Sequence, residues 1–173
     1  MPYPGGNLVR VTPTVVAGET ADNDVMFDAT EIPNAVSSRG GVSLLQGVTI
    51  IDKDAESVDM DVIFMQVQTN FGTADSPSTI TDANLQAAKV IGVLPFDFSD
   101  ASATFAQDSG NASIATFSSG NTGENVSTQL PLLVQAAGGS TSIYFTAIVQ
   151  DGNNADYAAT DDLEFVFHFK YIE

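Results

Sequence analysis

The chain has no cysteine and no tryptophan, a single histidine, and only five lysine and arginine residues. The lack of cysteine excludes disulfides, zinc–thiolate sites and thiol nucleophiles. A serine–histidine–acid triad would have to use His168, which lies in an aromatic segment, and no serine stands in a nucleophile-elbow sequence. We therefore expect His168 to be a packed or edge residue. We also expect no enzyme, no catalytic residue, no metal and no cofactor.

Positive charge is scarce. The chain has five lysine and arginine residues and 22 aspartate and glutamate residues, which give a net charge of −17. Such a surface repels phosphate backbones, which gain affinity through several lysine or arginine contacts. We therefore expect no nucleic-acid partner. The acidity is interpreted as a device for solubility rather than as a dedicated cation-binding function.

Long apolar runs are also missing, since none approaches the roughly 18 to 20 residues that a membrane helix needs. The start, MPYPGGNLVRVTP, lacks the basic end and apolar core of a signal peptide. We expect no membrane association and no export by the ordinary secretory route. At 173 residues, one domain over 1–173 is expected, with residues 1–7 as a flexible arm or a frayed end.

The sequence contains segments in which the type of side chain alternates with a period of two residues. In LEFVFHFKYI, the aromatic side chains alternate with others, and in SVDMDVIFMQVQ apolar residues alternate with acids before both sides become apolar. Alternation of this kind indicates strands that are buried on one face or, further along, on both. We expect Phe165, Phe167 and Phe169 to share one buried face.

Clusters of Gly, Asn, Asp and Ser separate these runs every dozen or so residues, as in β-sandwiches and jelly rolls. The best helix candidate lies near Asp82 to Lys89, where Thr81 or Asp82 is a suitable cap and Gly92 a suitable end. LPLLVQ is interpreted as a strand. The sequence predicts an all-β fold: a single antiparallel β-sandwich or jelly roll with one or two short helices.

Glycine and proline mark particular positions in the strands. Gly40 and Gly41 tolerate positive φ, so a sharp turn is expected there, followed by a central strand VSLLQGVTIID. Gly47 inside that strand indicates a bulge or a close approach of another backbone. Pro13 interrupts NLVRVTPTVVAG, which favours an edge position or a bulge.

Two acid-rich segments, DKDAESVDMD and DGNNADYAATDD, carry oxygen ligands at short spacings. Neither follows a calcium-loop pattern, which requires acids at alternate positions, a central glycine and a closing glutamate. Both are interpreted as turns.

Several longer stretches are similar to small virion structural proteins of marine tailed bacteriophages. In such proteins an Ile-Pro-Asn-Ala turn precedes a Gly-Gly strand, and a Ser-Thr-Ser-aromatic strand follows a Leu-Pro segment. The stretches that carry the resemblance are MFDATEIPNAVSSRGGVSLLQGVTIIDKD, VDMDVIFMQ, SPSTITDANLQAAKVIGVLPFDFSD and LPLLVQAAGGSTSIYFTAIV.

The resemblance implies a capsid decoration, or cement, protein that binds the phage major capsid protein and stabilises the head. It implies a place on the capsid surface of the virion, after synthesis in the host cytoplasm, and contacts with further copies of itself there. A neck, tail or fibre component and a calcium- or glycan-binding β module remain alternatives, because fold alone does not decide function. Arg10 and Arg39 are candidate partner-binding residues, as rare positive points in a negative field.

Overall fold

The computed structural model describes residues 5–98, 101, 103–106, 112–118, 130–150 and 152–172. Their strands form two antiparallel sheets and a short ribbon, so the all-β prediction is confirmed. The large sheet has the order β1-β12-β4-β8-β7, with β9 also paired to β4, and the small sheet has the order β3-β10-β5-β6. The large sheet comprises β1 (Gly6–Val11), β4 (Val42–Asp52), β7 (Ala103–Ala106), β8 (Ser113–Ser118), β9 (Leu132–Gln135) and β12 (Leu163–Ile172). The small sheet comprises β3 (Val25–Ile32), β5 (Met60–Met65), β6 (Val90–Phe96) and β10 (Ile143–Val149).

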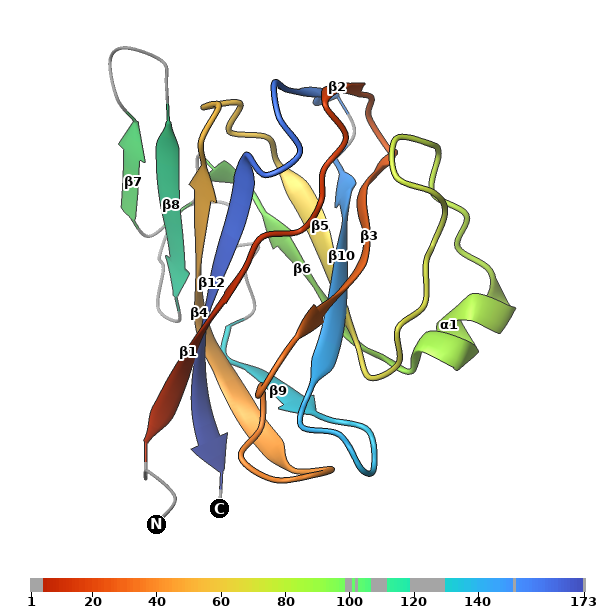
Figure 1. Ribbon diagram of the computed structural model, residues 1–173, viewed down its shortest axis with the longest axis vertical. Helices are drawn as coiled ribbons and strands as arrows, with labels where there is room; N and C mark the ends of the chain where they lie inside the picture. Colours follow the sequence, from red (N-terminus) through yellow and green to blue (C-terminus); the bar gives the residue numbers. More distant parts are fainter. Residues whose placement is uncertain are drawn as a thin grey trace.

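The two sheets face each other as the layers of a sandwich, and the small sheet carries a further cover (Figure 1). Helix α1 (Asp82–Ala88) and the segment before it lie on the outer side of that sheet. Ala88 and Phe71 pack there against Ile63, Met65 and other residues of the small sheet. The ribbon of β2 (Gly18–Thr20) and β11 (Ala155–Tyr157) lies at the end of the sandwich away from the chain termini.

The main core fills the space between the sheets and is rich in phenylalanine. Phe145 of β10 lies 5.1 Å from Phe165 and 5.0 Å from Phe167 of β12, ring centroid to ring centroid, in edge-on contacts. It also lies 5.2 Å from Phe27 of β3. Phe169 is buried on the same side of β12, so the predicted aromatic face is confirmed. Edge-on aromatic pairs add to the hydrophobic gain from burial, and these rings therefore join the two layers.

The helix lies where the sequence predicts, near Asp82 to Lys89, although Gly92 does not end it. Thr81 caps it, because its side chain accepts a hydrogen bond from the backbone N–H of Asn84, whose side chain bonds back to Thr81. The predicted end at Gly92 is wrong. The helix stops at Lys89, which adopts a left-handed conformation with φ of 50°. The backbone N–H of Gln66 already bonds to the carbonyl of Lys89, and this contact leads the chain into the pairing of β6 with β5.

The loop that precedes β4 turns as predicted, although its two glycines act differently. Gly40 has a φ of 68°. Gly41 does not have positive φ; it is required because a Cβ there would meet the carbonyl oxygen of Ser38 at 2.8 Å. β4 is central, and the pairing shifts by one residue next to Gly47, so the predicted bulge is present.

The start of the chain departs in part from the expected arm over residues 1–7. β1 begins at Gly6, and Gly6 and Asn7 pair with Lys170 and Phe169 of β12. Residues 1–4 lie outside the described part of the chain. β1 occupies an edge of the large sheet and ends at Val11, before Pro13, as the proline predicts.

We expect Phe145→Ala to reduce the free energy of unfolding by about 3–5 kcal/mol, because it removes the ring that contacts both layers. Urea unfolding followed by circular dichroism measures this loss. Leu85→Ala, on the exposed side of α1, is the control and should change stability by no more than about 0.5 kcal/mol. Equal effects of the two substitutions would contradict the assignment of Phe145 to the centre of the core.

Candidate functional site

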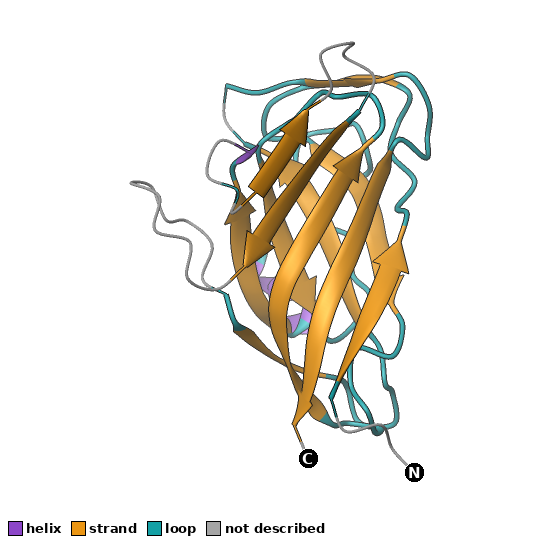
Figure 2. Ribbon diagram, turned by 90° about the vertical axis from the view of Figure 1, so that its left-hand side faces the viewer, coloured by secondary structure: helices purple, strands orange, loops and turns teal. Residues whose placement is uncertain are grey.

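The outer face of the large sheet is uncovered by any described element, whereas the small sheet lies beneath α1 and its neighbouring segment (Figure 2). We call this surface the open sheet face. The strand registers place alternate residues of β1, β4, β8 and β12 on it. Its members are Leu8, Arg10, Val42, Leu44, Gly47, Thr49, Ile51, Ile114, Thr116, Ser118, Glu164, Val166, His168, Lys170 and Ile172.

The open sheet face is rich in aliphatic side chains, several of which are well exposed. Leu8 is 65% exposed, Ile172 43% and Ile114 37%. β4 has eleven residues at about 3.3 Å rise each, and neighbouring strands lie about 4.8 Å apart, so the face covers on the order of 600 Å². That area includes the polar and charged side chains of the face, and the exposed aliphatic residues lie among them.

Charge on the open sheet face differs from charge on the rest of the chain. Glu164 is the one carboxylate that the described strand registers place on it, and it forms an ion pair with Arg10 of the neighbouring strand. Lys170 lies on the same face. Arg10 and Lys170 against Glu164 leave the face with one net positive charge, in a chain whose net charge is −17.

A row of polar side chains crosses the centre of the open sheet face. Thr49 of β4 lies between Thr116 of β8, 3.1 Å away between hydroxyl oxygens, and Nε2 of His168 of β12, 3.3 Å from its hydroxyl oxygen. Beside this row, the bulge at Gly47 leaves a shallow depression of about 310 Å³. A Cβ at Gly47 would lie 3.1 Å from the carbonyl oxygen of Phe117, which is a tight contact and favours glycine there.

His168 is half-buried in this row, and burial lowers its pKa from the usual histidine value. It therefore packs on the sheet, in line with the role expected from the sequence. Its hydrogen-bond partner is the hydroxyl of Thr49, which cannot orient it as a carboxylate would in a catalytic triad.

The structure does not bring the two predicted arginines together. Arg10 lies on β1, and its side chain is 67% exposed despite the ion pair with Glu164. Arg39 is exposed in the loop between β3 and β4, and it forms no ion pair within the described part of the chain. No signal in the sequence indicates the open sheet face as a whole, because alternation alone does not say which side of a sheet stays uncovered.

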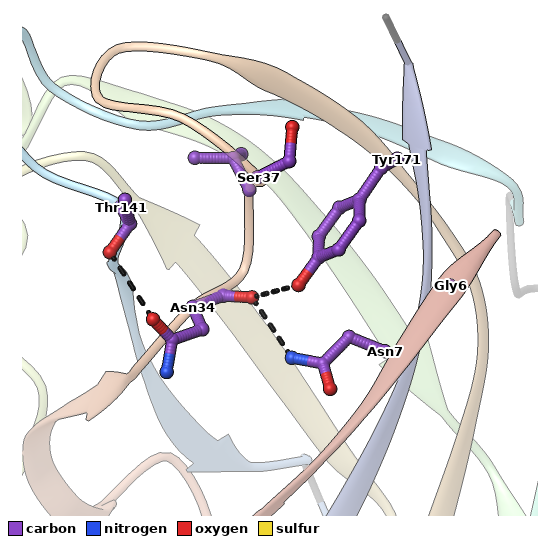
Figure 3. Close-up of a pocket in the computed structure, with 7 residues that line it drawn as sticks. Gly6, Asn7, Asn34, Ser37, Thr141 and Tyr171 are labelled. Atoms are coloured by element: carbon purple, nitrogen blue, oxygen red, sulfur yellow. Dashed lines mark hydrogen bonds between the residues drawn. The ribbon is translucent and has the colours of Figure 1, made fainter. Parts of the chain in front are cut away.

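A second hollow, of about 410 Å³, opens at the end of the sandwich where β1 begins and β12 ends (Figure 3). The backbone carbonyl of Asn34 accepts hydrogen bonds from the amide of Asn7, at 3.2 Å, and the hydroxyl of Tyr171, at 2.9 Å. The Thr141 hydroxyl donates to the side-chain oxygen of Asn34 at 3.5 Å. This lining is neutral and rich in amides and hydroxyls.

The two acid-rich segments of the sequence meet at the opposite end of the sandwich. The side chain of Asp54 accepts a hydrogen bond from the backbone N–H of Ala158 at 2.8 Å, and that of Glu56 from Asp156 at 3.3 Å. As the side chains stand, no three acidic or histidine residues in the described ranges form a group that could hold a metal ion. Within the same ranges, no helix has the length and apolar character needed to cross a membrane.

Comparisons with known proteins assign no family. No known family matches the sequence, and no curated protein matches it. Two solved structures of infectious bursal disease virus are weakly similar: the VP2 subviral particle, with 11% identity and a TM-score of 0.19, and the Gx strain, with 15% identity and a TM-score of 0.16. The first alignment covers 96% of this chain and 41% of the viral chain, the second 95% and 40%. The chain thus spans about two fifths of either protein, and at these TM-scores the likeness carries no argument about fold or function.

Because the folded state lowers the pKa of His168, the unfolded chain binds this proton more readily. The stability contributed by the neutral imidazole is full above the ordinary pKa of 6.5 and falls as the pH drops through it. We expect the parent protein to lose stability relative to His168→Gln between about pH 8 and about pH 5. Urea unfolding of both proteins across this range measures the difference.

In the difference between the two proteins, the contribution that their shared carboxyl groups make to the pH dependence of stability cancels. Burial raises the pKa values of Asp52 and Glu56, which acts with the opposite sign on stability, but equally in parent and variant. A difference that stays constant with pH would contradict the burial of His168 in its neutral form.

Proposed function

We propose that this protein is a non-enzymatic structural protein of a tailed-phage virion, and that it decorates the head by attaching to the major capsid protein through the open sheet face. The observation that carries the proposal is the contrast between this bare, aliphatic, nearly neutral face and the acidic remainder of the chain. The resemblance of the sequence to small phage virion proteins supplies the kind of partner.

The size and composition of the face suit attachment to another protein. A standard interface buries roughly 800 Å² on each partner, and the open sheet face, on the order of 600 Å², is of comparable size. Aliphatic residues such as Leu8 and Ile114 provide the apolar centre, and the polar row at His168 provides hydrogen-bonding groups. Burial of this apolar surface against the major capsid protein would supply the driving force for attachment.

Charge limits which side of the molecule approaches the shell. A copy with net charge −17 repels other copies and any acidic surface, except where its own charge is low. The open sheet face is such a place, because Glu164, the one carboxylate among its described residues, is paired with Arg10. The exposed guanidinium of Arg10 retains donors for a partner's carboxylates or carbonyls, and Arg39 offers a second cation on a neighbouring loop.

The neutral hollow in Figure 3 favours a second candidate function, a glycan-binding module. Amides and hydroxyls such as those of Asn7 and Thr141 match sugar hydroxyls in hydrogen bonding, and Tyr171 adds an aromatic ring beside them. A glycan screen with the purified protein tests this candidate. Saturable binding that Tyr171→Ala abolishes would favour it over decoration of the capsid.

The proposal predicts that heads without this protein assemble but release their genome at lower temperature, or on dilution from salt. A protein that binds the assembled lattice and not its dissociated parts stabilises the lattice by mass action. Added protein should restore stability more completely at moderate salt than in dilute buffer, because salt screens repulsion between copies. Genome release on heating, followed with a DNA-binding dye, is the measurement.

Matched variants identify the surface in the same assay. Leu8→Asp, on the open sheet face, should abolish the rescue, whereas Val93→Asp, at a 49% exposed site on the small sheet, should leave it intact. Arg39→Glu should weaken the rescue. If the stripped heads are as durable as intact ones, or if cryo-electron microscopy places the protein on the neck or tail, the decoration proposal is wrong.

A further inference from the structure

The outer edge of β3, at one side of the small sheet, is closed to a further strand. At Ala29 the backbone N–H bonds to the side-chain oxygen of Asn70, and the carbonyl accepts from the side-chain amide of Gln68, both at 2.8 Å. At Val25 a loop does the same, since the Val25 N–H bonds to the carbonyl of Ser76 at 3.0 Å. Natural sheets cover their edges in this way to prevent pairing with another chain.

The other described edges are interrupted or short. On β6, at the opposite side of the small sheet, Pro95 has no N–H to offer a neighbouring strand. The pairing of β6 with β5 also shifts by one residue at Ile91, and such a bulge bends an edge out of straight pairing. β7 and β9 have four residues each, and β2 and β11 have three. Short edge strands offer few groups to a partner.

β1 is the described edge strand without such protection. Its six residues, Gly6–Val11, contain no proline and pair with β12 without a shift in register. Within the described part of the chain, no backbone hydrogen bond joins β1 to any segment other than β12. A row of N–H and C=O groups about 20 Å long therefore faces outward along β1 with no strand beside it.

The charge at this edge also differs from that of the rest of the chain. β1 contains no acid, and its one charged residue, Arg10, is paired with Glu164 of β12. Lys170 of β12 lies opposite Gly6. Arg10 and Lys170 against Glu164 leave the edge with one net positive charge, in a chain whose net charge is −17. Two copies repel each other less here than at an acid-rich surface.

The side chains of β1 are complementary to those of a second β1. Leu8 is 65% exposed, more than any other large hydrophobic residue in the described ranges. If two copies of β1 pair antiparallel about a two-fold axis through Leu8, Leu8 lies opposite itself and Gly6 lies opposite Arg10. The two leucines then cover each other, and the glycine leaves room for the guanidinium. No two charges of the same sign are directly opposed in this register.

We propose that a second copy of this chain binds along the outer edge of β1, antiparallel and centred on Leu8, and joins the two large sheets into one. The two-fold axis is perpendicular to the sheet, so both open sheet faces lie on the same side of the pair. The inference goes beyond the proposed function and does not rest on it, because the free protein forms the pair. A failure to pair leaves attachment to the capsid untouched, since that is measured on heads.

The pair is expected to be weak in solution. It joins five residues of each β1, or about 17 Å of strand, and such a contact is small beside a standard interface of roughly 800 Å² on each partner. We expect a dissociation constant on the order of 100 μM, lower at moderate salt than in dilute buffer, because salt screens the repulsion between two acidic chains.

Sedimentation velocity of the full chain over a range of concentrations, in dilute buffer and at moderate salt, measures this equilibrium. We expect the fraction of dimer to rise with concentration and with salt. A protein that stays monomeric at about 1 mM in moderate salt would overturn the proposal.

Lysine substitutions identify the surface that pairs. Leu8→Lys places two like charges directly opposite each other and should abolish the dimer, since lysine is a residue that natural edge strands use against pairing. The controls are Leu133→Lys, at a 57% exposed leucine on β9, and Ile114→Lys, at a 37% exposed site of the open sheet face. Both controls should keep the dimer. If Leu8→Lys also keeps it, or if either control loses it, the copies do not pair through β1.

A crosslink tests the register through a gain rather than a loss. The chain has no cysteine, so one substitution introduces a single thiol. Leu8→Cys should form an intermolecular disulfide on mild oxidation at least about tenfold faster than Leu133→Cys, because directly opposed residues bring their Cβ atoms close to the distance that a disulfide needs. Non-reducing gel electrophoresis over time measures both rates. Equal rates for the two variants would show that Leu8 does not face a second Leu8.

Discussion

Burial of the aromatic side of β12 commits every alternate residue of that strand to the opposite surface. Successive side chains of a strand point to opposite faces, so packing Phe165 and Phe167 against Phe145 leaves Val166 and His168 on the outside. β12 lies between β1 and β4, and the strand registers carry this division across the large sheet. The open sheet face is thus a consequence of the same alternation that builds the core.

The two sheets of the sandwich differ in whether the chain covers their outer faces. The small sheet has an apolar outer side, and the chain covers it with α1 and Phe71. The large sheet also carries aliphatic residues outside, such as Leu8 and Ile51, yet no described element covers them. Both outer sides carry apolar residues, and among the described elements the chain covers only the outer side of the small sheet.

Alternation and turn chemistry sufficed to predict much of the fold. The aromatic face of β12, the central position of β4, the bulge at Gly47 and the cap at Thr81 each follow from a local rule that the tertiary structure does not override. The end of α1 does not follow from such a local rule, because Lys89 takes a left-handed conformation that sequence patterns usually assign to glycine. Strand pairing with β5 decided that boundary, and such pairing is invisible in a local window.

The candidate sites were less predictable, because they depend on residues that only the fold brings together. Arg10 was singled out for its rarity, but its pairing with Glu164 joins residues 154 positions apart. The acid-rich segments were each judged alone, whereas their contacts, such as that between Asp54 and Ala158, cross 104 positions. Sequence spacing describes one segment at a time, and it has no access to contacts between two segments far apart in the chain.

Charge is distributed unevenly between the open sheet face and the rest of the chain. Among the described residues, the strand registers place two of the five lysine and arginine residues and one of the 22 acids on the open sheet face. The other acids lie elsewhere in the molecule or outside the described residues. On a lattice, copies bound through this face would turn their acidic surfaces sideways and outward. Repulsion between neighbours then falls off over a Debye length of about 10 Å or less at moderate salt, while the apolar contact with the shell is insensitive to it.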